Sequence, residues 1–178
     1  MRSFSKRPKP LERDALLEYA SRALAARALS IGELKQKLRS RAAQETDVDS
    51  VLSSLKQAGA LNDRKFADSY ASARLTNQGF GSSRVLRDLM VRKVPSTVAK
   101  EAVRQAYEET DESALIEQFL ARKYRGKDLP ALLQEEKYLA SAYRRLRTAG
   151  FNSSASIRVL KRYASQADEL ESLETTDD

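Results

Sequence analysis

The sequence is similar to itself at shifts of about fifty residues. A shift of 51 residues lays Leu34 on Val85 and Leu38 on Leu89, and a shift of 57 carries Leu89 onto Leu146. The match continues at other apolar positions on either side, so the chain divides into three related units. A unit of about 50 residues buries little surface alone. Stacking of neighbouring units is therefore the expected source of stability.

Each unit contains three segments with the apolar period of an α-helix, as in Val48, Val51, Leu52 and Leu55. The chain has only 6 Gly and 4 Pro, so few residues interrupt these segments. Ser30 followed by Glu33 forms a capping box at one start, and Pro130 suits a first turn. Gly59, Gly79 and Gly150 each follow a periodic run, where a helix often ends. The predicted helices are 11–28, 31–42, 47–58, 63–77, 82–92, 96–109, 112–125, 130–148 and 153–170.

The predicted fold is all-α, an elongated, curved array of three tandem three-helix repeats with nine helices. A compact bundle of the same nine helices is the alternative. The expected divisions are a basic flexible arm (1–10), repeat 1 (11–61), repeat 2 (62–110), repeat 3 (111–165) and an acidic tail (166–178). The aromatic residues Tyr19, Tyr70 and Phe119 occupy corresponding apolar positions, so we expect them to pack in the core.

Charge is unevenly distributed along the chain. There are 32 Lys and Arg against 25 Asp and Glu, a net charge of +7, and the tail contains acids and no base. The rest of the chain is therefore more basic than the whole, which favours a polyanionic partner such as nucleic acid or an acidic protein surface. The alternative is that the basic excess only maintains solubility.

Basic residues recur on the second helix of every unit, and stacked units would align them into a stripe. Such a stripe could follow a phosphate backbone with little sequence preference. A solvated helix face is the alternative interpretation. The candidate residues for contact with DNA or a protein partner are Arg84, Arg87, Lys93, Arg144, Arg145, Arg158 and Arg162.

Enzymatic chemistry has little support in this composition. The chain has no His and no Cys, the commonest general base and a common nucleophile. No cofactor and no metal site is expected. The GFGSS segment at 79–83 lacks the Lys and the preceding strand of a phosphate-binding loop, so we interpret it as a helix–helix turn. No apolar run predicts a membrane span and no signal peptide is recognisable, which indicates a cytoplasmic protein.

Four segments of the chain resemble the RecX family of bacterial regulatory proteins. They are RALSIGELKQKL (27–38), VLSSLKQAGALNDRKFADSYASAR (51–74), GFGSSRVLRDLMVRKV (79–94) and LRTAGFNSSASIRVL (146–160). The most telling piece is the link GALNDRKFA (59–67) within the second segment. The resemblance covers about residues 12–165. The sequence departs from the family pattern at Ala42-Ala43, where a Gly is usual, and at Lys93-Val94, where Lys-Gly-Ile is usual. Both departures fall at helix ends.

The resemblance implies a curved, elongated modulator of the RecA recombinase and no enzymatic activity. Family members bind RecA, dock in the groove of its nucleoprotein filament and suppress filament growth, ATP hydrolysis and strand exchange. It therefore implies roles in homologous recombination, DNA repair and the SOS response. The expected partners are RecA, free and as filament, and single- and double-stranded DNA bound weakly and without specificity. A monomer is expected because the repeats bury one another. A free-standing helical DNA-binding protein and a passive helical scaffold are the alternatives.

Overall fold

A computed structural model of the chain describes residues 9–164 and 167. Over these residues it contains ten α-helices, one turn of π-helix and no β-strand, so the prediction of an all-α fold is confirmed. An isolated bridge pairs Leu11 with Ala42. The helices are α1 (Arg13–Ala26), α2 (Ile31–Arg39), α3 (Glu45–Gln57), α4 (Asp63–Ala73) continued by the π-turn Arg74–Gln78, α5 (Ser82–Val91), α6 (Ser96–Tyr107), α7 (Glu112–Lys123), α8 (Leu129–Leu132), α9 (Glu136–Thr148) and α10 (Ser153–Leu160).

The stretch expected as one helix over 130–148 is two helices, α8 and α9. The carboxylate of Asp128 accepts a hydrogen bond from the Ala131 amide and so caps α8, with Pro130 in its first turn. Leu133 and Leu139 are both buried, yet a continuous helix would place residues six positions apart on different sides. The break between α8 and α9 brings both side chains into one core.

Residues at the two ends of the chain lie largely outside the described part. The residues outside it are 1–8 of the basic arm, Ser165, and all of the acidic tail except Ala167. The last predicted helix, 153–170, ends at Leu160 as α10, followed by a turn.

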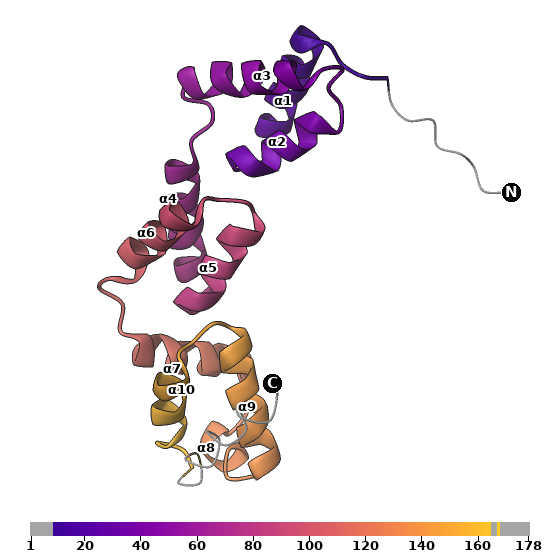
Figure 1. The fold of residues 1–178 in the computed structure, drawn as a ribbon. Helices are drawn as coiled ribbons and strands as arrows, with labels where there is room; N and C mark the ends of the chain where they lie inside the picture. The colour runs from indigo at the N-terminus through magenta and orange to yellow at the C-terminus, as the bar shows by residue number, and fades with distance from the viewer. Residues whose placement is uncertain (1–8, 165–166, 168–178) are drawn as a thin grey trace, which may run out of the picture. The chain divides into compact units, whose positions relative to one another are not determined.

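The chain forms two compact units, and each is described by itself. The first consists of Met1–Ala67 with Leu89–Ala99. In it α1, α2 and α3 pack against one another in pairs (Figure 1). The capping box predicted at Ser30 and Glu33 is present and begins α2. The core of these three helices is built from their buried apolar side chains, among them Leu16, Leu34, Leu38, Val48 and Val51.

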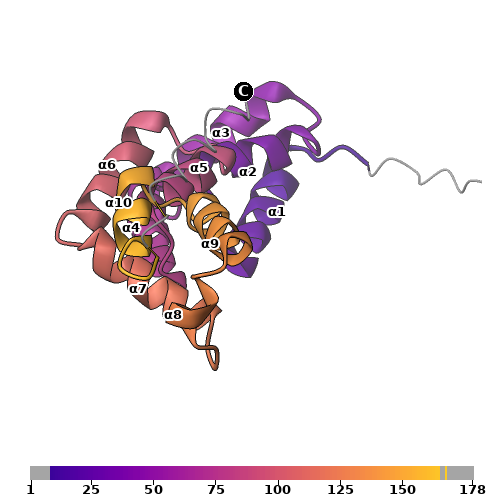
Figure 2. The ribbon, with the colours of Figure 1, turned by 90° about the horizontal axis from the view of Figure 1, so that it is seen from below.

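The second unit consists of Asp68–Asp88 with Lys100–Asp178. Helix α10 packs on both α7 and α9, and the three lie together in Figures 1 and 2. The ring of Phe119 meets that of Phe151 edge to face at a centroid distance of 5.4 Å, which confirms Phe119 as a core residue. The largest core of the described residues belongs to this unit.

The GFGSS segment is a helix–helix turn, as predicted, and it is anchored on the turn between α9 and α10. Gly79 has a positive φ of 57° and ends the π-turn. The amide of Gly81 donates to the carbonyl oxygen of Ala149 at 2.9 Å, and that of Ser83 donates to Gly150 at 3.2 Å. The two turns approach so closely that a Cβ on Gly150 would collide with the backbone of Arg84. This contact fixes where α5 begins.

Candidate functional site

The second unit has an open hollow of about 420 Å³ whose wall is strongly basic. Of its described lining side chains, four are cations, two are aromatic rings, two carry hydroxyls, and none is a carboxylate. These residues are Phe80, Arg84, Phe119, Lys123, Ser141, Arg144, Arg145, Thr148 and Ala149. We call this surface the basic hollow.

Arg84 contributes from the first turn of α5. Its guanidinium carbon lies 3.9 Å from the centre of the Phe80 ring, a close cation–π contact. Phe80 is itself held, because its carbonyl oxygen accepts a hydrogen bond from the Tyr107 hydroxyl at 2.6 Å. Arg84 therefore lies over a ring whose backbone is anchored, and its guanidinium N–H groups have no hydrogen-bond partner among the described residues.

Lys123 contributes from the last turn of α7, four residues after Phe119. Its ammonium nitrogen lies 5.7 Å from the centre of the Phe119 ring. A smaller hollow of about 220 Å³ shares Phe80, Phe119 and Lys123 and adds Gln78 and Arg122. Arg122 donates to the carbonyl oxygen of Gln78 at 2.7 Å. The cationic surface therefore continues from the basic hollow toward the π-turn.

Helix α9 supplies the remaining charges. Arg144 and Arg145 are exposed, and Ser141 and Thr148 flank them about one turn away. The opposite side of α9 is buried in the core through Leu139, Ala142, Tyr143 and Leu146. Burial raises the pKa of the Tyr124 hydroxyl, and the positive charge of Arg145 opposes part of that rise.

The four cations of the basic hollow form no ion pair with a carboxylate among residues 9–164 and 167. Four positive charges held together without counter-charges repel one another, and a bound anion relieves that repulsion. Guanidinium forks match phosphate and carboxylate oxygens in geometry. The arrangement can therefore hold an extended polyanion.

Three of the seven predicted site residues, Arg84, Arg144 and Arg145, meet in the basic hollow. Arg158 donates to the Ser113 hydroxyl at 3.0 Å, and Arg162 forms an ion pair with Glu117, so both contact α7. The remaining two predicted residues, Arg87 and Lys93, are exposed. Lys93 belongs to the first unit and Arg87 to the second.

Lys123 and Arg122 are not among the residues predicted from the sequence. The predicted cations lie on or just after the second helices of the second and third units and on the last helix, whereas Lys123 and Arg122 end the first helix of the third unit. The spacing of Phe119 and Lys123 could have revealed them, because residues four apart share a helix face. A cation following an aromatic residue at that distance is suited to a cation–π contact.

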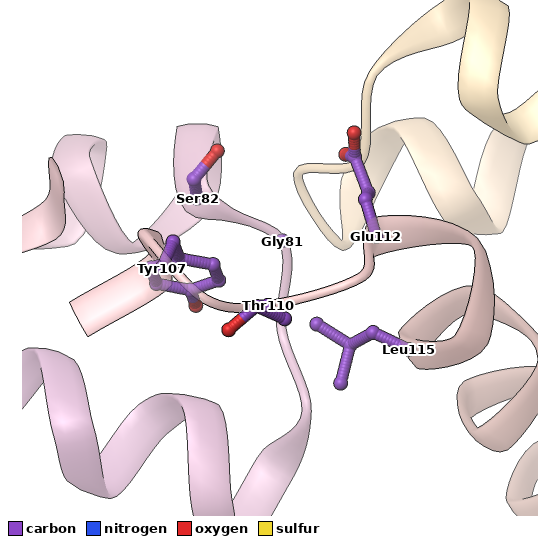
Figure 3. A pocket seen from close by; sticks show the side chains of 6 residues that line it. All are labelled: Gly81, Ser82, Tyr107, Thr110, Glu112 and Leu115. Atoms are coloured by element: carbon purple, nitrogen blue, oxygen red, sulfur yellow. The ribbon is translucent and has the colours of Figure 1, made fainter. Parts of the chain in front are cut away.

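A third hollow, of about 190 Å³, lies in the same unit, and Figure 3 shows the side chains that line it. Two of its polar side chains form hydrogen bonds within the fold. Tyr107 donates to Phe80, and burial raises the pKa of its hydroxyl. The carboxylate of Glu112 accepts from the Asn152 amide at 2.8 Å. Its other described lining residues are Gly81, Ser82, Thr110 and Leu115, so the described lining contains no cation and no acid without a hydrogen-bond partner.

No group of three or more His, Cys, Asp or Glu side chains that could hold a metal ion occurs among the described residues. Within the same residues, every helix is too short or too polar to cross a membrane.

The sequence matches no protein-family model. It is similar to the regulatory protein RecX of Deinococcus radiodurans, with 33% identity over 151 residues that cover 84% of this chain and 69% of that protein. The RecX of Chromohalobacter salexigens is 32% identical over 124 residues, covering 68% of this chain and 80% of its own length. That of Amycolatopsis mediterranei is 33% identical over 103 residues, 58% of each chain.

Solved structures share the fold. The crystal structure of RecX from Lactobacillus salivarius superposes with a TM-score of 0.63 at 18% identity, over 85% of this chain and 96% of that one. A second crystal structure of a regulatory protein RecX gives a TM-score of 0.62 at 17% identity, over 83% and 70%. The all-α arrangement of the described residues is therefore one that other folded proteins adopt.

Proposed function

The chain belongs to the RecX family of regulatory proteins, and we propose that it binds the RecA recombinase and its nucleoprotein filament. On this proposal it mainly inhibits filament growth, ATP hydrolysis and strand exchange, and so acts in recombination, DNA repair and the SOS response. It works without catalysing a reaction, as a monomer, in the cytoplasm where the recombinase works.

The observation that carries the proposal is the basic hollow. A filament of recombinase on DNA presents both a protein surface and a phosphate backbone. Arg84, Lys123, Arg144 and Arg145 supply four cations within one open surface, and no carboxylate that would repel phosphate is among its described lining residues. Contacts of this kind position a protein on nucleic acid without reading its sequence.

The aromatic rings of the hollow support phosphate recognition more than base recognition. Arg84 covers a face of Phe80, and Lys123 lies over Phe119. Base stacking requires an open ring face. We therefore expect the hollow to bind single- and double-stranded DNA weakly and without sequence preference. We also propose Arg87, Arg158 and Arg162 of the second unit, and separately Lys93 of the first unit, as further residues that contact the partner.

The test is ATP hydrolysis by RecA on single-stranded DNA, with this protein added below stoichiometric amounts at two salt concentrations. The natural chain should suppress hydrolysis. The variant R144E/R145E should suppress it much less, because each reversal removes a contact and adds repulsion. The matched control is K100E/K127E, which changes the net charge equally at two exposed residues of the same unit that lie outside the hollow.

Three outcomes separate the functions. Suppression by the natural chain and by the control, but not by R144E/R145E, supports the proposal. Salt-sensitive binding to the same DNA without any effect on hydrolysis favours a free-standing helical DNA-binding protein. The absence of both binding and suppression would leave a helical scaffold and would overturn the proposal.

A further inference from the structure

The basic hollow carries an excess of positive charge, and the same chain contains a negatively charged segment, residues 168–178. We propose that residues 168–178 occupy the basic hollow when no other polyanion does, and that they compete with nucleic acid for it. This inference rests on the proposed function only for the identity of the competitor. The contact itself concerns residues of this chain alone.

The charges of the two parts are complementary. The segment contains six carboxylates and no Lys or Arg; they belong to Asp168, Glu169, Glu171, Glu174, Asp177 and Asp178. The hollow and its extension at Arg122 contribute five cations, and none of the described residues that line either surface is a carboxylate. Carboxylates accept the same bidentate hydrogen bonds from guanidinium groups that phosphates accept. An acidic peptide is therefore a chemical substitute for a phosphate backbone at this surface.

The segment starts close enough to reach the hollow. Ala167, the residue before it, is fully buried in the same core as Leu139 and Leu146 of α9. That helix also carries Arg144 and Arg145 on its exposed side. Its 13 residues span about 20 Å. Eleven extended residues span up to about 36 Å. From an origin in the α9 core, residues 168–178 can therefore reach any position along that helix.

Attachment to the chain makes even a weak contact significant. A short tether holds its end group at an effective concentration in the millimolar range. We expect the segment to weaken the binding of an external polyanion by about 3- to 10-fold at low salt. The effect should decline as salt rises, because exposed charges are screened over about 8 Å at physiological ionic strength.

The contact can be trapped directly because the chain has no natural cysteine. In the variant S141C/T175C, one thiol lies in the hollow and the other in the acidic segment. Its rate of intramolecular disulfide formation is compared with that of S154C/T175C, whose first thiol lies on α10 outside the hollow. We expect the hollow pair to form at least about five times faster. Adding R144E/R145E should remove that advantage. Equal rates for the two pairs would overturn the proposal.

Competition is measured with a fluorescent oligo(dT) probe and a variant whose tail carries no charge but keeps its length. That variant is D168N/E169Q/E171Q/E174Q/D177N/D178N. Binding should become 3- to 10-fold tighter at low salt. Because the substitutions also raise the net charge, the same six changes are made in the R144E/R145E background. In the R144E/R145E background the gain in oligo(dT) affinity should disappear. An equal gain in both backgrounds would show a general charge effect and would contradict the proposal.

The two measurements also distinguish this inference from the proposed function. Disulfide trapping requires neither RecA nor DNA. Fast trapping in a protein that binds no oligo(dT) and leaves RecA unaffected would overturn the proposed function and support the contact. Suppression of RecA that depends on Arg144 and Arg145, without faster trapping of the hollow pair, would support the proposed function and overturn the contact.

Discussion

Gly32 and Lys93 are in direct backbone contact within the first unit. A Cβ on Gly32 would lie 2.7 Å from the carbonyl oxygen of Lys93 and closer still to its Cβ. Lys93 has a φ of 62°, and its amide donates to Met90 at 2.9 Å while that of Val94 donates to Leu89 at 3.1 Å. It is thus the left-handed residue that closes α5. The N-terminus of α2 therefore packs on this helix end.

The contact predicts that Gly32→Ala destabilises the protein although Ala favours helices. The added methyl group meets backbone that cannot move independently, and such overpacking costs about 1–3 kcal/mol. Urea unfolding should show a lower midpoint with an unchanged slope. An Ala variant as stable as the natural chain would show that the two segments separate easily.

Lys93→Gly should make the protein more stable. A left-handed conformation costs a residue with a Cβ about 1 kcal/mol that glycine avoids. The control is Lys93→Ala, which removes the same charge but keeps the Cβ. The glycine variant should exceed the alanine variant by about 1 kcal/mol in unfolding free energy. It should also recover part of the loss in Gly32→Ala, because the two Cβ atoms would no longer meet. Equal stability of the two Lys93 variants would contradict this account.

Gly150 and Gly59 provide a matched pair of substitution sites that tests the close contact beside Arg84. Both have positive φ values, 90° and 70°. A Cβ on Gly150 would collide with the backbone of Arg84, whereas one on Gly59 would meet nothing within 4 Å. Gly59→Ala should cost about 1 kcal/mol from backbone strain alone. Gly150→Ala should cost about 2 kcal/mol more through overpacking. It should also weaken oligo(dT) binding by displacing Arg84. Equal losses in the two variants would argue against a close contact between the turns.

Asp63 and Asp49 should influence the pH dependence of stability in opposite directions. Burial raises the pKa of Asp63, against the hydrogen bond from the Ile31 amide. The contribution of Asp63 to the free energy of unfolding is therefore largest below the usual pKa of 3.8. It is lost as the pH rises through the higher pKa that Asp63 has in the folded protein. Lys35 lowers the pKa of Asp49, so that contribution is present above pH 3.8 and is lost in acid.

Unfolding free energies measured from pH 3 upward test this pair. Asp63→Asn should make the rise of stability with pH steeper, since a group that opposes the rise is removed. Asp49→Asn should make the rise shallower. The same sign of change in both variants would refute the assignment.

Local signals in the sequence were sufficient to predict most of the helices. The apolar period, the capping box at Ser30 and the glycines at 59, 79 and 150 each act over a few residues, so they can be read without tertiary information. The division of 130–148 into α8 and α9 could not be predicted in this way. It depends on whether Leu133 and Leu139 enter the same core, and only the packed second unit decides that.

The basic hollow was only partly predictable for the same reason. Arg84, Arg144 and Arg145 belong to second helices of their repeats, so repetition identified them. Lys123 ends a first helix and meets them through the packing of α7 against α10 and of α10 against α9. Nothing in the sequence favours Arg84, Arg144 and Arg145 over Arg158 and Arg162. The contacts of Arg158 with Ser113 and of Arg162 with Glu117 depend on the tertiary structure and cannot be predicted from the distribution of charge along the chain.

Variants of Lys123 and Arg158 test which residues contact nucleic acid. Lys123 is a candidate from the structure alone, whereas Arg158 was predicted from the sequence. Lys123 lines the basic hollow without a carboxylate partner among the described residues, whereas the guanidinium of Arg158 already donates to Ser113. Each phosphate neutralised on single-stranded DNA contributes about 0.7 to the slope of log affinity against log salt. Lys123→Gln should therefore reduce the slope for oligo(dT) by about 0.7. Arg158→Gln should reduce it by less than half of that. A larger change for Arg158→Gln would place the nucleic acid on α10 instead of in the basic hollow.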